Sequence, residues 1–242
     1  LITGAGKGIG KACSIALAEA GAKVIIISRT ENDLKKLTKI IKKTKGTSKF
    51  FVCDVTDTQK FNSIVNSLPK LDILVNNAGT NIPEHFTKVK KNSLDYMINL
   101  NLKASFNVAQ ICVKKMLRYK NRKKIGGSVI NISSQLGKVG ASLRSVYCMT
   151  KFGIEGLTRG MAIDLSASNI RVNTVCPTLV ETPMVKAYLK NKKLKNEMIK
   201  KIPLGRVAKD SDVATAVAFL AADSSSMITG TSLFVDGGWT AQ

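Results

Sequence analysis

The chain has 242 residues, and its 38 Lys and Arg against 16 Asp and Glu give a formal charge of +22. Hydrophobic residues make up 44%, which excludes general disorder, and the single histidine, His85, excludes a zinc site built from several histidines. A charge of this size is typical of proteins that meet nucleic acid, an anionic membrane or an acidic substrate.

Strand and helix patterns alternate along the whole chain, beginning with a first strand that leads into Thr3. Further apolar runs predict strands at 24–27, 50–53, 73–75, 128–132, 171–175 and 232–235. Helical patterns occupy about 9–21, 31–44, 57–67, 101–120, 147–167 and 210–222. Because the strand runs are apolar throughout, both of their faces are expected to be buried.

This alternation predicts an α/β fold. We expect a single doubly wound Rossmann-type domain over 1–242, with a parallel sheet of about seven strands and helices on both faces. The Lys-rich stretch at about 178–209 leaves the C-terminal end of a strand, where ligands bind in such sheets. We interpret it as a substrate loop or lid, with short helical pieces around 182–190 and 193–201.

The cysteines and the longest apolar run bear on the compartment. Five cysteines without a CxxC pair indicate a reduced, cytoplasmic chain rather than a disulfide framework, and no metal site is expected. The longest apolar run, 213–222, has about half of the ~20 residues that a membrane span requires. The sequence shows no signal peptide and opens without Met, so we expect a few residues to precede Leu1.

A glycine-rich turn at 3–10 joins the first strand to the first helix. Its glycines let the backbone turn tightly and approach a ligand, and the N–H groups at the helix start favour a pyrophosphate. We interpret it as a dinucleotide site, the alternative being a tight turn without a ligand. The candidate contacts are Gly4, Gly6, Lys7, Gly8, Ile9 and Gly10.

The end of the second strand favours NADP(H) over NAD(H). NAD sites carry an acidic residue there, about 20 residues after the turn, but this chain has Ser28 and Arg29. Arg29 suits a ribose 2′-phosphate, and Lys7 lies on the same side. Thr30 and Asp33 resemble an N-cap pair of the next helix, which gives the acidic residue a structural role.

Three motifs follow in order: the TGxxxGxG turn at 3–10, the NNAG sequence at 76–79, and Tyr147 with Lys151 as a YxxxK pair. The CDV sequence at 53–55 and the VDGG ending at 235–238 extend the match over essentially the whole chain. This ordered set resembles the short-chain dehydrogenase/reductase family of the classical type. The resemblance implies an oxidoreductase that interconverts a carbonyl and a secondary alcohol by hydride transfer.

The resemblance implies four catalytic residues, Asn101, Ser134, Tyr147 and Lys151. Ser134 precedes Tyr147 by the family's usual 13 residues, whereas the neighbouring Ser133 would face the other side of its strand. Tyr147 and Lys151 share one helix face, so the ammonium is expected to lower the tyrosine pKa from about 10 and to make it a general acid or base. Ser134 would hold the substrate oxygen. By resemblance, Asn101 would support a water that links Lys151 to solvent.

Further cofactor contacts come from the resemblance alone. Asp54 lies where the family meets the adenine edge, and Thr182 lies where it meets the carboxamide. Pro177 is followed by Thr178 instead of the usual glycine, which leaves the loop geometry open. The remaining contacts are Val55, Asn76, Ala78, Gly79, Tyr147, Lys151 and Pro177.

Two substrate classes remain open, because the fold does not choose between them. Reduction of a 3-oxoacyl group on an acyl carrier protein ranks first, since the stretch 178–201 mixes apolar residues for an acyl chain with lysines for an acidic carrier. A sugar, polyol or cyclic alcohol dehydrogenase, such as a gluconate or glucose dehydrogenase, ranks second. Gln135 beside Ser134 and the DGGWTA ending at 236–241 favour this alternative.

The positive charge is concentrated in lysine clusters, which we interpret as solvated helix faces and ends. They attract anionic NADP(H). No aromatic residues interleave with them, so neither nucleic acid nor membrane is an expected partner. A cofactor-binding regulator or nucleic-acid binder is a remote alternative. By resemblance the protein is a homo-oligomer, a dimer or tetramer, with the helices at 101–120 and 147–167 between subunits. One cluster comprises Lys114, Lys115, Arg118, Lys120, Arg122, Lys123 and Lys124.

Overall fold

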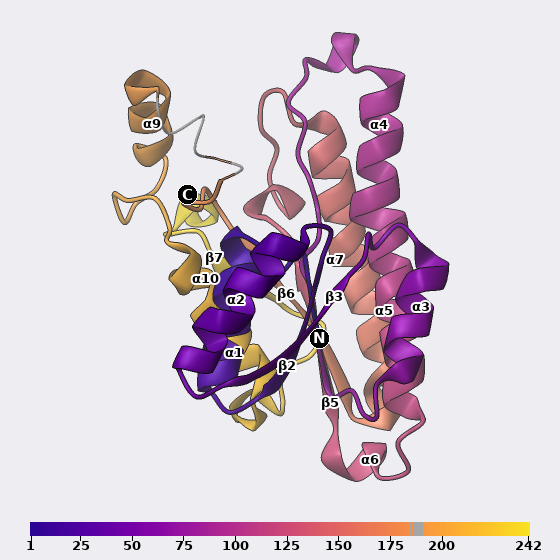
Figure 1. Ribbon diagram of the computed structural model, residues 1–242. Helices are drawn as coiled ribbons and strands as arrows, with labels where there is room; N and C mark the ends of the chain where they lie inside the picture. The colour runs from indigo at the N-terminus through magenta and orange to yellow at the C-terminus, as the bar shows by residue number, and fades with distance from the viewer. Residues whose placement is uncertain (184, 186–190) are drawn as a thin grey trace.

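A computed structural model of the protein describes residues 1–183, 185 and 191–242. Its centre is a parallel seven-stranded sheet with the order β3-β2-β1-β4-β5-β6-β7 (Figure 1). The strands are β1 Ile2–Thr3, β2 Lys23–Ser28, β3 Thr47–Val52, β4 Ile73–Asn76, β5 Gly127–Ile132, β6 Ile170–Pro177 and β7 Ser232–Val235. This order confirms the predicted doubly wound sheet and places its switch point between β1 and β4, where ligands bind in such folds.

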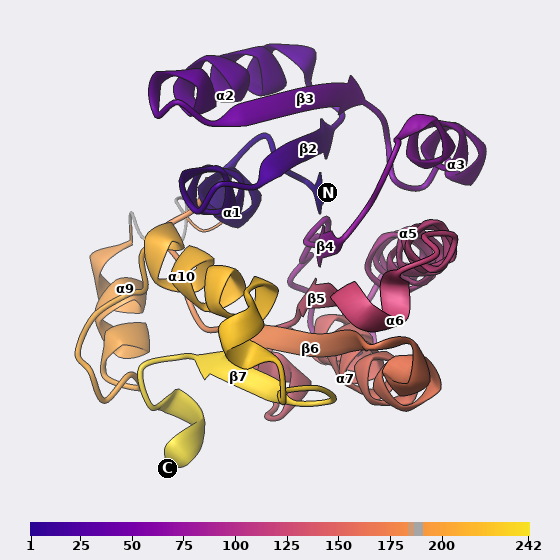
Figure 2. The ribbon, with the colours of Figure 1, turned by 90° about the horizontal axis from the view of Figure 1, so that it is seen from below.

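Helices cover both faces of the sheet, as Figure 2 shows. Helices α1, α2 and α10 pack on one face, and α3, α5 and α7 on the other. Val24 and Ile26 of β2 point to the first layer, while Ile25 and Ile27 point to the second. The helices are α1 Gly8–Glu19, α2 Glu31–Lys43, α3 Thr58–Ser67, α4 Lys91–Ile98, α5 Ser105–Leu117, α6 Arg122–Ile125, α7 Ser145–Leu165, α9 Lys192–Ile199 and α10 Asp210–Ala221.

The helix expected at 101–120 differs from the prediction. Helix α4 precedes it and continues through a π-helical segment, Asn99–Ala104, into α5. The sequence hid α4 because Lys90 forms no side-chain cap and the first turn holds no acidic residue. Of the helical pieces expected in the lid region, α9 matches the one at 193–201. Most of the piece at 182–190 lies outside the described residues.

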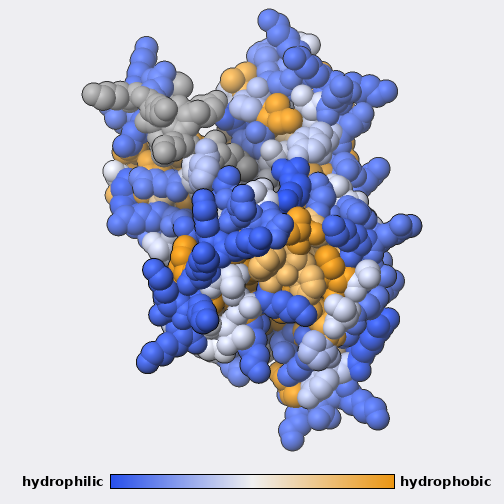
Figure 3. Space-filling view, in the orientation of Figure 1, coloured by the Kyte–Doolittle hydropathy of each residue, from blue (hydrophilic) through white to orange (hydrophobic). Residues whose placement is uncertain are grey.

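The described part of the chain contains no helix that is long and apolar enough to cross a membrane. It also contains no group of three His, Cys, Asp or Glu side chains that could hold a metal ion. All five cysteines are free thiols. Figure 3 shows one face of the molecule as largely hydrophilic, with hydrophobic side chains gathered near its middle between α2 and α3. The lysines of α2 are exposed, as expected of a solvated helix face.

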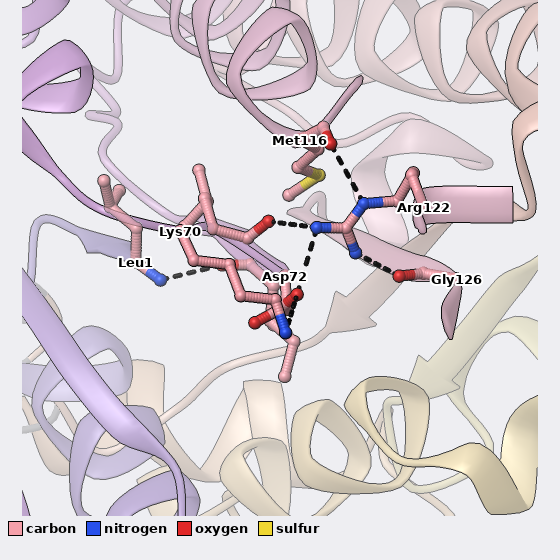
Figure 4. A network of polar contacts seen from close by, with 8 residues as sticks. Leu1, Lys70, Asp72, Met116, Arg122 and Gly126 are labelled. Atoms are coloured by element: carbon pink, nitrogen blue, oxygen red, sulfur yellow. Dashed lines mark hydrogen bonds and ion pairs between the residues drawn. The ribbon is translucent and has the colours of Figure 1, made fainter. Parts of the chain in front are cut away.

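Arg122 is an exception to the solvated clusters, because it is only 3% exposed. Its Nε donates to Met116 O at 3.0 Å, and its Nη2 donates to Leu71 O at 2.7 Å and to Asp72 Oδ1 at 3.0 Å (Figure 4). Its Nη1 donates to Gly126 O. One guanidinium therefore ties the end of α5 to the segments that lead into β4 and β5. The sequence could not reveal this, because one basic residue in a basic run carries no burial signal.

Candidate functional site

The glycine-rich turn lies at the switch point, between β1 and α1. Gly4 has a φ of +63° and Gly8 a φ of +52°, which favour glycine, and a Cβ on Gly10 would lie 2.4 Å from Gly4 O. Asn77 and Ala78 donate their backbone N–H groups to Thr3 Oγ1 at 3.0 and 3.1 Å. The NNAG sequence therefore holds the turn from the neighbouring strand. Ile9 belongs to the first turn of α1, where no acidic side chain competes for the helix N-terminus.

The two cations predicted for a 2′-phosphate both flank the end of β2. Lys7 Nζ lies 3.3 Å from Asp33 Oδ2, and Arg29 Nη1 lies 3.6 Å from Asp54 Oδ2. The interpretation of Thr30 and Asp33 as an N-cap pair is wrong. Thr30 holds the N-cap position without a side-chain hydrogen bond, and Asp33 instead forms the ion pair with Lys7.

An open pocket of about 290 Å³ borders this turn, lined by Gly6, Lys7 and Asp33 among others. The buried Ser28 Oγ beside it has no hydrogen-bond partner. A Cβ on Gly6 would lie 3.0 Å from that oxygen. A tight glycine turn, an orphaned hydroxyl and two exposed cations together fit a phosphorylated ribose.

Side-chain hydrogen bonds of the NNAG sequence link it to neighbouring segments of the chain. Asn76 is buried, and its Nδ2 donates to Ser105 O at 2.9 Å and to Asn131 Oδ1 at 3.1 Å, so its side chain faces the protein interior. A Cβ on Gly79 would lie 3.3 Å from Asn101 Oδ1. Val55 is buried in the core beside Asp54. The Asn77 side chain contacts the glycine turn directly, because its Nδ2 donates to Thr3 O at 2.9 Å and to Gly4 O at 3.3 Å.

The segment after β6 folds back to the glycine turn. Val180 bridges to Ala208, and Thr182 Cγ2 lies 3.0 Å from where a Cβ of Gly8 would be. Thr178 is not among the residues with positive φ, so the missing glycine after Pro177 leaves no backbone strain. The sequence left this geometry open, and in the structure threonine meets it without backbone strain, although its buried Oγ1 has no hydrogen-bond partner.

The four predicted catalytic residues come from β5, α7 and the π-helical segment. Ser134 follows β5 and hydrogen-bonds to the Tyr147 phenol. Lys151 Nζ lies 5.5 Å from the centroid of the Tyr147 ring and donates to Ile132 O at 2.8 Å. Asn101 lies in the π-helical segment, a form often found at functional sites, and its Nδ2 donates to Thr80 O and Thr150 Oγ1.

Burial governs the pKa values of the tyrosine–lysine pair. It raises the pKa of Tyr147 to about 12, although the hydrogen bond with Ser134 opposes this. It lowers the pKa of Lys151 to about 8, against the opposing effects of Cys176 and Glu155. The expectation of a tyrosine pKa below 10 is therefore wrong for the protein without bound ligands, because desolvation of the phenol outweighs the lowering effects of Ser134 and Arg144.

Near this pair, the structure reveals the contact of Gln135 with Ser134 and the burial of Glu155, which the sequence did not predict. Ser134 Oγ donates to Gln135 Oε1 at 2.9 Å and accepts from the Leu136 N–H at 3.1 Å, so its hydroxyl is oriented. Glu155 is buried one helical turn beyond Lys151. Its only sequence signal is its spacing of four residues from Lys151. Ser133 is also buried, and its Oγ lies near Gly137 rather than beside Ser134 Oγ.

Known proteins resemble this chain over its whole length. A family model described as enoyl-(acyl carrier protein) reductase matches residues 4–240. L-xylulose reductase of Bos taurus is 38% identical over 241 residues, covering 100% of this chain and 96% of the relative. The 3-oxoacyl-(acyl-carrier-protein) reductase of Thermotoga maritima is 37% identical over 242 residues, covering 98% and 96%.

Solved structures agree with this. A putative 2-deoxy-D-gluconate 3-dehydrogenase of Agrobacterium tumefaciens with bound NADP has a TM-score of 0.92 at 32% identity, covering 100% of this chain and 95% of its own. The fold and the relatives define an oxidoreductase that acts on alcohol or carbonyl groups. The chain belongs to the short-chain dehydrogenase/reductase family, which binds NAD(P).

Proposed function

We propose that the protein transfers hydride between NADP(H) and a ketone or secondary alcohol, and that Tyr147 moves the proton. The observation that carries the proposal is the meeting of Ser134, Tyr147 and Lys151 at the C-terminal end of β5. When bound, the nicotinamide supplies or accepts the hydride. The residues of the chain orient the substrate and handle the proton.

In the reductive direction, the Tyr147 hydroxyl gives its proton to the carbonyl oxygen while the carbonyl carbon receives the hydride. The Lys151 ammonium favours the tyrosinate that remains. The Ser134 hydroxyl, which donates to Gln135 Oε1 in the protein without substrate, turns to donate to the substrate oxygen. Asn101 supports the water path from Lys151 to solvent, through which Tyr147 regains its proton. In the oxidative direction each of these steps reverses.

A preference for NADP(H) rests on Arg29, Lys7 and the unpartnered Ser28 Oγ. We expect Arg29→Ala to lower kcat/KM for NADPH by about 10- to 100-fold, because a charge-assisted hydrogen bond contributes about 1.5–3 kcal/mol. The value for NADH should change little. Steady-state kinetics with both cofactors measure this. The exposed Arg118→Ala is the control, and a wild-type preference for NADH would contradict the assignment.

The substrate we propose is a hydroxylated ketone of the sugar or polyol class, which reverses the order of the two classes that the sequence alone favoured. Gln135 is buried beside Ser134, and an amide there can bond a hydroxyl next to the carbonyl, which a 3-oxoacyl group lacks. A 3-oxoacyl thioester is the second candidate. It is supported by the reductase of Thermotoga maritima and by exposed lysines such as Lys193 and Lys200, which would suit an acidic carrier protein. The apolar residues Met184, Tyr188 and Leu189 lie outside the described residues.

An assay of NADPH oxidation over a panel of keto sugars, cyclic ketones and 3-oxoacyl thioesters tests the function. Turnover of a hydroxylated ketone that falls in Gln135→Leu, with thioester turnover unaffected, would support the first class. Turnover of thioesters alone would establish the second. If no ketone oxidises NADPH and no alcohol reduces NADP+, the proposed function is wrong.

A homo-oligomer is part of the proposal. Phe106 on α5 is 47% exposed and Phe152 on α7 is 50% exposed, and a second pocket is lined by Leu102, Phe106 and Leu157. Two half-exposed aromatic side chains on adjacent helices of one layer favour an interface with another subunit. We expect Phe152→Asp to reduce the assembly to a smaller species in sedimentation velocity. An unchanged mass, or a monomeric wild type, would contradict an interface at α7.

The remaining parts of the proposal concern the segment 178–209 and the compartment. The segment 178–209 contacts the glycine turn through Thr182, which supports a role for this segment as a lid over the cofactor. Five free thiols support a reducing compartment such as the cytoplasm.

A further inference from the structure

Glu155 lies on the same stripe of α7 as the tyrosine and the lysine. Tyr147, Lys151 and Glu155 are spaced by four residues, so their side chains follow one another along one helix face. Glu155 is 5% exposed, which is unusual for a carboxylate. None of the steps proposed above uses it.

Three donors from the neighbouring strands fix this carboxylate. Ser232 Oγ of β7 donates to Oε2 at 2.5 Å, and Thr174 Oγ1 of β6 donates to the same oxygen at 3.2 Å. Cys176 Sγ of β6 donates to Oε1 at 3.3 Å. Both carboxylate oxygens of Glu155 are therefore held in place, one helical turn along α7 from Lys151.

The ion pair between Glu155 and the exposed Arg159 is weak. Arg159 Nη2 lies 3.8 Å from Oε2, but Arg159 is 62% exposed, so water screens the pair. Lys151, by contrast, is 8% exposed and lies one helical turn away. Two buried opposite charges at this spacing act on each other with little screening.

A role in stability alone does not explain why residue 155 is a charged carboxylate. A neutral amide could bond the same hydroxyls and thiol, and a buried carboxylate without a buried, paired partner costs stability. We propose that Glu155 is a positioning residue that keeps the Lys151 ammonium charged beside Tyr147. This inference rests on the function proposed for that pair.

The other titratable groups around the pair do not supply this charge. Burial raises the pKa of the Cys176 thiol on β6 to about 12, so it is neutral at physiological pH. Arg144, which precedes α7, and Cys148 on α7 act on the Tyr147 phenol. Gln135 and Asn101 contribute uncharged amides. Cys176 and Glu155 both act to raise the pKa of Lys151 against burial, and Glu155 is the carboxylate of the two.

Glu155→Gln tests the inference. Lys151 carries a pKa of about 8, so reduction should slow above pH 8 as its charge is lost. Without the carboxylate, this alkaline limb of kcat should move about one pH unit lower. Activity at pH 6 should stay close to wild type, whereas activity at pH 8 should fall several-fold. Glu155→Asp, which keeps the charge, should restore most of the limb.

A second readout does not need turnover. In the protein without cofactor, the ¹³Cε signal of labelled Lys151, assigned with Lys151→Met, should titrate about one pH unit lower in Glu155→Gln. Asp164→Asn removes an exposed charge from the same helix. Asp164 lies about 20 Å along the helix from Lys151, so this change should alter neither readout.

The outcomes separate this inference from the proposed function. An unchanged limb and an unchanged Lys151 midpoint in Glu155→Gln would overturn the role of Glu155, even if stability fell. A lowered midpoint in a protein that turns over no ketone would support the coupling of Glu155 to Lys151 and would refute the proposed function instead.

Discussion

Tyr147→Phe is expected to lower kcat by about 10²- to 10⁴-fold, the range that a positioned general acid contributes. The substitution removes the phenol oxygen that gives the proton to the substrate. Ser134 would keep its bonds to Gln135 Oε1 and to the Leu136 N–H, so the surrounding structure should survive. NADPH oxidation at pH 7 with the best ketone of the panel measures the loss.

Cofactor affinity separates this loss from misfolding. The dissociation constant for NADPH, followed by fluorescence, should change far less than kcat in Tyr147→Phe, because the phenol is only one of many predicted cofactor contacts and those of the glycine turn lie at the start of α1. Tyr119→Phe removes a phenol oxygen at the end of α5 and is the matched control. If Tyr147→Phe keeps more than a tenth of the wild-type kcat, Tyr147 is not the acid.

Arg122→Met should lower the free energy of unfolding by about 3–5 kcal/mol, the cost of breaking a buried charged network. The loss would leave the carbonyls of Met116, Leu71 and Gly126 without their donor. Asp72 contributes less, because it is 41% exposed and also lies 3.2 Å from Lys70 Nζ. Urea unfolding followed by circular dichroism measures the change.

Arg122→Lys should recover only part of this stability, because an ammonium cannot reproduce the planar fork that reaches several acceptors. The exposed Lys123→Met is the control and should stay within about 0.5 kcal/mol of wild type. A value for Arg122→Met within 1 kcal/mol of wild type would mean that water replaces the guanidinium at these carbonyls.

The sequence predicted the parallel sheet, its helices on both faces and the catalytic candidates. It could do so because strands buried on both faces appear in the sequence as apolar runs. The glycine turn and the YxxxK pair are also short motifs, which can be recognised without knowledge of distant contacts. It missed α4, whose start has no capping signal, and it treated Arg122 as one of several solvated cations. The first error follows from a missing local signal, whereas the burial of Arg122 depends on Leu71 and Asp72, which are distant in the chain.

The sequence by itself determined the class of fold and which side chains could do chemistry, since periodicity and spacing are local properties. Only the tertiary structure decided the environment of those side chains. Burial raises the pKa of Tyr147 and lowers that of Lys151, and hydrogen bonds from Thr174 of β6 and Ser232 of β7 hold the buried Glu155. The charge of +22 shows the same division: sequence counts the cations, but burial decides that Arg122 holds three segments together.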